Sequence, residues 1–228
     1  MVLPSLVSLQ SNPDYGTIFA VWVWPVLAGI LGAVVGGYFV VISINRWQRP
    51  TLVISLADNR YDGQAPAHYV HLEVHNKKNR LHSWIGGGTA VNCKCTITVN
   101  GRSFVTKWAS REPWGTRVAF STPSGIRVAG VPDQQHIDQA KLEVINPDET
   151  KRVDVAVRSK GDADCYIHTP ENFLQLESYP KGPEANRLPS GEHAATALIE
   201  CDGYRAPIFS FTIVNGEGTD AGLLRLEQ

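Results

Sequence analysis

The sequence predicts an all-β soluble domain, built as an antiparallel β-sandwich, that follows one N-terminal transmembrane helix. An apolar run without Asp, Glu, Lys or Arg occupies residues 17–44. After it, short stretches alternate apolar and polar residues and are separated by Gly, Pro, Asn and Asp. Val, Thr and Ile recur in these stretches, which favours strands and turns over long helices. These observations predict a single-pass membrane protein with a β-rich domain.

The domain organisation follows from the end of the apolar run. Arg49-Pro50 marks the exit from the helix, because proline moves its predecessor out of the helical region and cannot continue the backbone bonding. Many short strands without intervening helices then imply one sheet packed on another. We therefore expect a short tail over 1–16, a transmembrane helix over 17–45, a juxtamembrane linker over 46–50 and a β-sandwich over 51–228.

The apolar segment is long enough to span a bilayer. At about 1.5 Å per residue it reaches roughly 40 Å, more than the ~30 Å hydrocarbon core. Trp22 and Trp24 near one end and Trp47 near the other are expected to anchor at the two interfaces. A soluble helix of this length is rarely apolar on every face. A cleavable signal peptide is the closer alternative, but the first sixteen residues contain no Lys or Arg.

The charges that flank the helix predict its orientation. Arg46, Arg49 and, further on, Arg60 follow the span, whereas Asp14 is the only charged side chain before it. Positive charge favours the cytoplasmic side. We therefore expect the N-terminus outside, the C-terminal domain in the cytoplasm, and reduced cysteines.

Small residues form a stripe along the predicted helix. Ala28, Gly32 and Gly36 recur every fourth residue, which places them on one side of the helix. Such stripes let a second helix approach closely in a bilayer. The sequence therefore predicts packing against a protein partner or a second copy of the chain. The alternative is that the stripe reflects only the common use of Gly and Ala in membrane helices.

Ten segments of the soluble region are predicted to form strands. Asn100-Gly101 is expected to be a tight hairpin turn between two of them, and residues 170–189 a long loop. Trp84, Trp108 and Trp114 are expected to cap the ends of the sandwich or to contact a partner. The predicted strands are Thr51–Ala57, Tyr69–Asn76, Thr89–Val99, Ser103–Trp108, Thr116–Phe120, Lys141–Ile145, Arg152–Arg158, Cys165–His168, Ala194–Cys201 and Ile208–Val214.

Five short motifs carry a resemblance to a known fold. Residues 72–76 (LEVHN), 89–93 (TAVNC) and 99–101 (VNG) resemble the pattern of immunoglobulin-like sandwich modules of prokaryotic membrane and surface proteins. Residues 188–193 (LPSGEH) and 209–213 (FSFTI) resemble the last strands of such modules. The resemblance implies an immunoglobulin-like antiparallel β-sandwich with a binding or structural role, and no catalytic residues transfer from it. Insertions between the motifs leave open one enlarged sandwich or two.

Alternation along 89–99 predicts which of its residues are buried. One face carries Val91, Cys93, Cys95, Ile97 and Val99 and is expected to face the core. On this reading the cysteines act as small hydrophobic residues. A disulfide or a metal or redox role are the alternatives, although no second pair of cysteines at zinc-binding spacing accompanies them.

A second strand carries another set of candidate metal ligands. His71, Glu73 and His75 share one face of the 69–76 segment, opposite Val70 and Leu72. Two imidazoles with a carboxylate between them could hold a metal ion. The ordinary solvent side of a sandwich strand has the same alternating pattern, and it is the favoured interpretation.

The sequence limits the function classes. A net charge of −1 and a pI near 6.6 give no reason to expect nucleic-acid binding. The sequence has no GxSxG, P-loop, HExxH or dinucleotide fingerprint. We therefore expect a membrane-tethered, non-catalytic interaction or scaffold module that needs no cofactor and serves a membrane assembly. The alternative is a small membrane-bound metal-binding protein or enzyme that uses the His71, Glu73 and His75 face.

Overall fold

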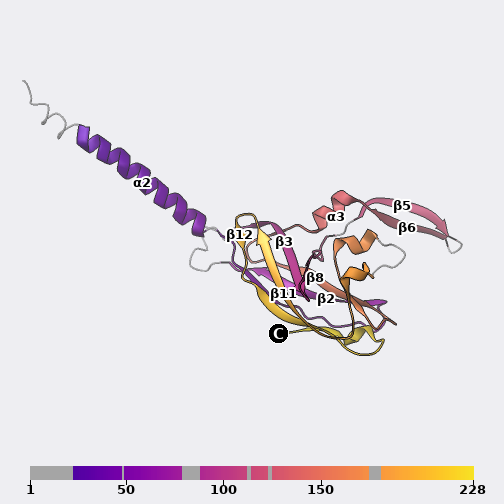
Figure 1. The fold of residues 1–228 in the computed structure, drawn as a ribbon. Coiled ribbons are helices and arrows are strands. Elements are labelled where there is room, and N and C mark those ends of the chain that lie inside the picture. The colour runs from indigo at the N-terminus through magenta and orange to yellow at the C-terminus, as the bar shows by residue number, and fades with distance from the viewer. Residues whose placement is uncertain (1–22, 48, 79–87, 112–113, 123–124, 175–180) are drawn as a thin grey trace, which may run out of the picture. The chain divides into compact units, whose positions relative to one another are not determined.

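The chain forms two compact units, Met1–Trp47 and Gln48–Gln228. The computed structural model describes residues 23–47, 49–78, 88–111, 114–122, 125–174 and 181–228 (Figure 1). The first unit contains a helix, and the second contains two larger antiparallel sheets and a two-stranded one. A β-rich domain preceded by one apolar helix is therefore confirmed.

The helix α2 (Trp24–Trp47) has Pro25 in its first turn, where a missing N–H is tolerated. Its segment Trp24–Ile42 is long and apolar enough to cross a membrane. These 19 residues measure about 28 Å along the axis, close to the thickness of the hydrocarbon core. The helix continues through Trp47, so it includes two residues that we assigned to the linker. Residues 17–22 of the predicted span, with Trp22, lie outside the described residues.

The five-stranded sheet has the order β1-β2-β8-β9-β10. Its strands pair antiparallel, and β2 pairs with β8 over most of their length. The strands are β1 (Leu52–Leu56), β2 (Ala67–Asn76), β8 (Thr150–Ser159), β9 (Cys165–Ile167) and β10 (Arg187–Leu188).

The seven-stranded sheet has the order β14-β13-β11-β3-β4, with β12 added to β11 and β7 added to β3. The predicted Asn100-Gly101 turn joins β3 to β4, and both residues have positive φ, 52° and 74°. Positive φ at two central residues is typical of the tight hairpin turn that matches strand twist. The strands are β3 (Ala90–Val99), β4 (Arg102–Val105), β7 (Glu143–Ile145), β11 (Gly191–Cys201), β12 (Tyr204–Arg205), β13 (Phe209–Asn215) and β14 (Leu224–Glu227).

Several elements were not predicted. The predicted strand Thr116–Phe120 lies within β5 (Trp114–Thr122), but β5 forms a hairpin with an unpredicted strand, β6 (Gly125–Pro132), that leads into the helix α3 (Gln134–Ala140). The Asp133 side chain begins this helix by accepting a hydrogen bond from the Gln135 N–H. We expected neither β6 nor β14, and we expected no helix between strands. The predicted loop over 170–189 contains the 3-10 helices η3 (Pro170–Leu174) and η4 (Glu184–Asn186) and the strand β10.

Both large sheets contribute side chains to one hydrophobic core. The predicted burial of Cys93, Cys95, Ile97 and Val99 is confirmed, but Val91 is 39% exposed and Ala90 is buried instead. The reason is a bulge between Ala90 and Cys93, where Asn92 has a φ of 54°. A bulge inserts one extra residue and shifts the alternation by one position.

Trp108 is a buried member of this core and does not cap an end of the domain. The predicted strand 103–108 ends at Val105, after which the chain leaves the seven-stranded sheet and pairs with β8 through a Trp108–Val153 bridge. The fully buried indole donates its Nε1 hydrogen to the Cys93 carbonyl at 2.9 Å. Trp84 lies outside the described residues, and Trp114 is the first residue of β5.

Candidate functional site

The face of β2 that carries the candidate metal ligands is tied to β8. The register places His71, Glu73 and His75 opposite Asp154, Arg152 and Thr150. His71 Nδ1 lies 2.9 Å from Asp154 Oδ1, Arg152 Nη2 donates to Glu73 Oε1 at 3.0 Å, and His75 Nδ1 lies 3.0 Å from Thr150 Oγ1. Within the described part of the chain, no group of three or more His, Cys, Asp or Glu could hold a metal ion. The three side chains thus have three separate cross-strand partners.

The buried carboxylate of Asp154 is the centre of a polar cluster that our sequence analysis missed. Lys107 Nζ lies 3.0 Å from Asp154 Oδ2, and His168 Nδ1 lies 3.1 Å from the same oxygen. Lys107 Nζ also donates to the backbone carbonyls of Trp108 and Arg111. A bulge in the pairing of β2 with β8 adds one residue on β8, and every residue from Val153 to Arg158 is buried. The only sign of this cluster in the sequence was one acidic residue, Asp154, within a run of Val and Ala.

The electrostatics of this cluster favour fixed charges over proton transfer. Burial raises the pKa of the Asp154 carboxyl, but hydrogen bonds with His168 and His71 and the charge of Lys107 outweigh it and hold the pKa well below its ordinary range. Burial lowers the pKa of His168 in spite of Asp154. A general base needs a pKa near the working pH and access to substrate. Asp154 is 4% exposed, and its lowered pKa keeps it ionised near neutral pH. The cluster is therefore suited to joining β2 and β8 to the segments that follow β4 and β9.

A second buried carboxylate lies beside a small pocket of about 200 Å³. Glu143 on β7 accepts two hydrogen bonds from the Arg111 guanidinium, at 2.8 and 3.2 Å, and one from the Ser110 hydroxyl. Burial raises the pKa of Glu143, but the hydrogen bonds from Arg111 and Ser110 outweigh it and lower the pKa. This paired carboxylate also has the properties of a structural group.

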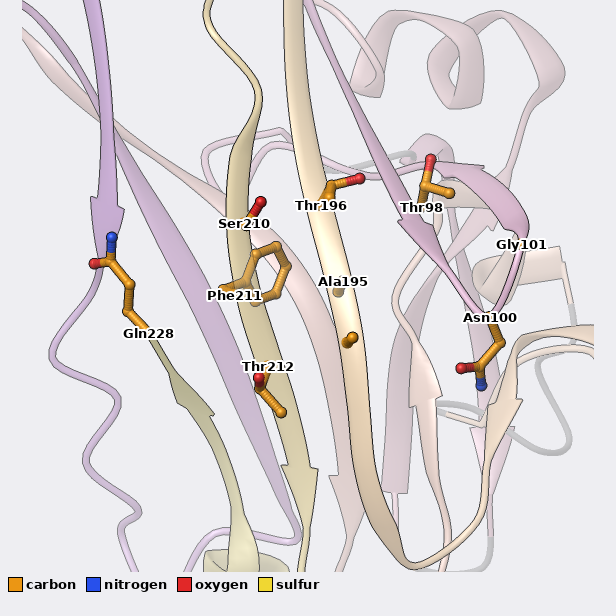
Figure 2. A pocket seen from close by; sticks show the side chains of 10 residues that line it. Thr98, Asn100, Gly101, Ala195, Thr196, Ser210, Phe211, Thr212 and Gln228 are labelled. Carbon is orange, nitrogen blue, oxygen red and sulfur yellow. The ribbon is translucent and has the colours of Figure 1, made fainter.

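The outer face of the seven-stranded sheet carries a row of hydroxyl groups. Ser103, Thr98, Thr196 and Ser210 stand directly opposite one another on four consecutive strands. Figure 2 shows the side chains of Thr98, Thr196 and Ser210 beside a shallow depression of about 480 Å³. Ser, Thr, Asn and Gln are the polar side chains among the described residues that line it. This surface can donate and accept hydrogen bonds, but those side chains supply no acid, base or cation.

The helix α2 carries the other surface that the sequence predicted. A groove of about 590 Å³ runs along it and includes Ala28 and Gly32 in its lining. A Cβ atom added at Gly32 or Gly36 would meet no described heavy atom within 4 Å. Trp24, predicted as an interface anchor, is 60% exposed at the start of the helix. Trp47 is the last residue of the helix.

Comparisons of the chain with protein-family models, with curated proteins and with solved structures find no match.

Proposed function

We propose that this protein is a single-pass, membrane-tethered interaction module that has no catalytic role and serves a membrane assembly. The observation that carries the proposal is α2, whose apolar surface extends over 19 residues and is grooved along Ala28 and Gly32. A tether alone requires an apolar surface and no groove. The small residues Ala28 and Gly32 in the lining of this groove allow a second helix to approach closely, and such packing contributes to helix association in lipid.

The strand order of the domain supports an immunoglobulin-like assignment. Such sandwiches have strands A, B and E adjacent in one sheet and strands C, F and G adjacent in the other. The orders β1-β2-β8 and β3-β11-β13 have the same adjacencies, and β4 takes the place of the extra strand beside C. The domain departs from antibody domains because β2 has no cysteine to pair with Cys201 on β11. Proteins of this architecture often present surfaces and loops for binding.

The chemistry of the buried polar groups supports a role without catalysis. Asp154 and Glu143 are each paired with a cation and have a lowered pKa. Neither carboxyl group has the raised pKa of a general acid near neutral pH. The hydroxyl row of the seven-stranded sheet is a more accessible polar surface, and it is suited to hydrogen bonding with a partner.

The test of the proposal is association of the helix in a membrane. Gly32→Ile with Gly36→Ile keeps the segment apolar but places branched side chains on the small-residue stripe, one of them in the lining of the groove. We expect insertion to persist and association to weaken about tenfold, which equals about 1.4 kcal/mol. The measurements are an in-membrane association assay of the span and quantitative co-purification of full-length chains that carry different tags.

A matched control places similar bulk on the opposite side of the helix. Val41 is 56% exposed and does not line the groove. It lies on the opposite side of the helix from Gly32, so Val41→Phe adds bulk away from the groove. This control should associate like the original chain. If the original chain, the glycine variant and the control associate equally, the helix serves only as an anchor and the proposed pairing is wrong.

We also propose that the N-terminus is outside and the β domain is cytoplasmic, with the arginines after the span as support. The test is a cysteine engineered at the exposed residue Gln64, placed in a chain that carries Cys201→Ser. A membrane-impermeant thiol reagent should label it only after the cells are lysed. Strong labelling in intact cells would reverse the orientation.

A further inference from the structure

Cys93 on β3 and Cys201 on β11 stand opposite each other on adjacent antiparallel strands. The register pairs Ile199 with Cys95 and Glu200 with Lys94. One further step of the same register brings Cys201 opposite Cys93. Each thiol is the main influence on the pKa of the other, and all four cysteines of the chain are free. The pair is therefore a dithiol within one sheet.

The backbone around this pair has the geometry that a disulfide needs. The Cys93 carbonyl accepts a hydrogen bond from Trp108 Nε1, on the side of β3 away from β11. The Ile199 carbonyl accepts from the Ala206 N–H on the side of β11 away from β3. Cys201 lies two residues after Ile199 and has the same orientation. Cys93 and Cys201 thus form a non-hydrogen-bonded pair, for which Cα atoms lie about 4.5 Å apart, inside the disulfide range of about 4.4 to 6.8 Å.

The four cysteines differ in reactivity. Cys201 is the only one that is not fully buried, and the hydrogen bond from Cys93 lowers its pKa. The same hydrogen bond, together with burial, raises the pKa of Cys93. Burial raises the pKa of Cys95 and of Cys165 to about 12. Because the thiolate is the nucleophile, Cys201 is the residue that reacts first.

We propose that Cys93 and Cys201 form a reversible cross-strand disulfide by exchange with a low-molecular-weight disulfide such as oxidised glutathione. The Cys201 thiolate attacks one sulfur of the oxidant, forms a mixed disulfide and releases one thiol. Cys93 then loses its proton and attacks the Cys201 sulfur, which releases the second thiol. The chain loses two electrons and two protons, and the oxidant gains both as two thiols.

The cross-link has a structural consequence because it joins two neighbouring strands beside the β3 bulge. Asn92, the residue with positive φ, already contacts β11's end through a hydrogen bond to Asp202 at 2.8 Å. The residues between the two cysteines form a long loop, and closing a long loop restricts the unfolded chain. The oxidised domain should therefore melt at a higher temperature than the reduced domain. The state of this pair reports whether the domain faces an oxidising or a reducing compartment.

The test uses the full-length protein in mild detergent, incubated in glutathione buffers that range from reduced to oxidised. After quenching, denaturation and alkylation, the oxidised protein should carry two alkyl groups and the reduced protein four. Peptide mapping should identify the Cys93–Cys201 bond. Before alkylation, the intact mass of the oxidised protein should be lower than that of the reduced protein by two hydrogen atoms. Four alkylated cysteines in fully oxidised buffer, or a bond to Cys95 or Cys165, would overturn the proposal.

Variants test the order of the two steps. Cys93→Ala should retain glutathione on Cys201, because the resolving thiol is missing. Cys201→Ser keeps a hydrogen-bonding group at the accessible position and should form neither the mixed disulfide nor the cross-link. The control Cys165→Ala should still form the cross-link. If glutathione accumulates on Cys93 in the Cys201→Ser variant, then Cys201 is not the first nucleophile and the proposed order of steps is wrong.

Discussion

The five-stranded and seven-stranded sheets contribute to the same core, but they bury residues of different kinds. On β3 and β11 the buried positions hold Cys, Ile, Val and Ala, with His193 near the start of β11 as the one polar residue, while Thr and Lys point outward. On β8 the buried positions include Asp154 and Arg158. The difference arises because other segments of the chain cover one sheet face and leave another open to solvent. One face of the seven-stranded sheet carries the open hydroxyl row, whereas other segments cover β8 on its second face.

The two buried charges of β8 show how that covering is stabilised. Asp154 joins Lys107, His71 and His168. Arg158 donates to the carbonyls of Asp162, Gly216 and Gly218 and to the side chain of Asn215. A buried charge is tolerated only when its hydrogen bonds are satisfied. The strand β8 therefore depends on specific polar partners, whereas β3 depends mainly on the packing of its inward side chains.

The largest expected effect comes from breaking the Asp154 cluster. Asp154→Ala leaves Lys107 in the interior without its carboxylate, and we expect a loss of about 3 to 5 kcal/mol in the free energy of unfolding. Denaturant unfolding of the full chain in detergent measures it. Asp154→Asn keeps the shape and some hydrogen bonds, so it should cost less. Equal stability of Asp154→Ala and the original chain would contradict the assigned role.

The same cluster predicts that the stability of the domain depends on pH. The folded pKa of His168 lies below its ordinary value of 6.5 because of burial, so the unfolded chain binds more protons at acid pH. Stability should therefore fall as the pH drops below about 6.5. The lowered pKa of Asp154 adds a loss below 3.8. His168→Gln, which does not titrate, should flatten the upper part of the profile; an unchanged slope would assign it to other groups.

A core substitution in the seven-stranded sheet gives a smaller effect of another kind. Ile97 is fully buried, and Ile97→Val removes one methylene group from the packed interior. The expected loss is about 0.5 to 1.5 kcal/mol. This loss should be the same at pH 7 and pH 5, because no charge is involved. A loss that grows at pH 5 would show that the two sheets are coupled.

The smallest effect is expected at the hydroxyl row. Thr196 is partly exposed on the outer face of β11, and Thr196→Ala should change the free energy of unfolding by less than about 0.5 kcal/mol. Measurement in the same denaturant series as Asp154→Ala allows direct comparison. A loss above 1 kcal/mol would mean that another segment covers this face.

Period-2 alternation predicted the strands with one open face almost completely. Thr89–Val99 and Ala194–Cys201 were predicted within a few residues, and the buried side predicted for Thr89–Val99 was correct except at the bulge. The bulge at Asn92 left no signal in the alternation, because Val91 and Ala90 are both apolar. The Asp154 cluster was missed because its partners come from β2, β9 and the segment after β4, which are far apart in sequence.

Local patterns in the sequence by themselves determined the apolar helix, the main strands, the Asn100-Gly101 turn and the inward side of β2. These features depend on residue type and on spacing within a few positions, so they can be read without knowing the fold. The tertiary structure decided that Asp154 meets Lys107 and that Cys93 faces Cys201. It also decided that Trp108 contacts both β8 and β3 in the core. Each depends on strand register or on a chain crossing between sheets, and both are set by contacts between distant segments.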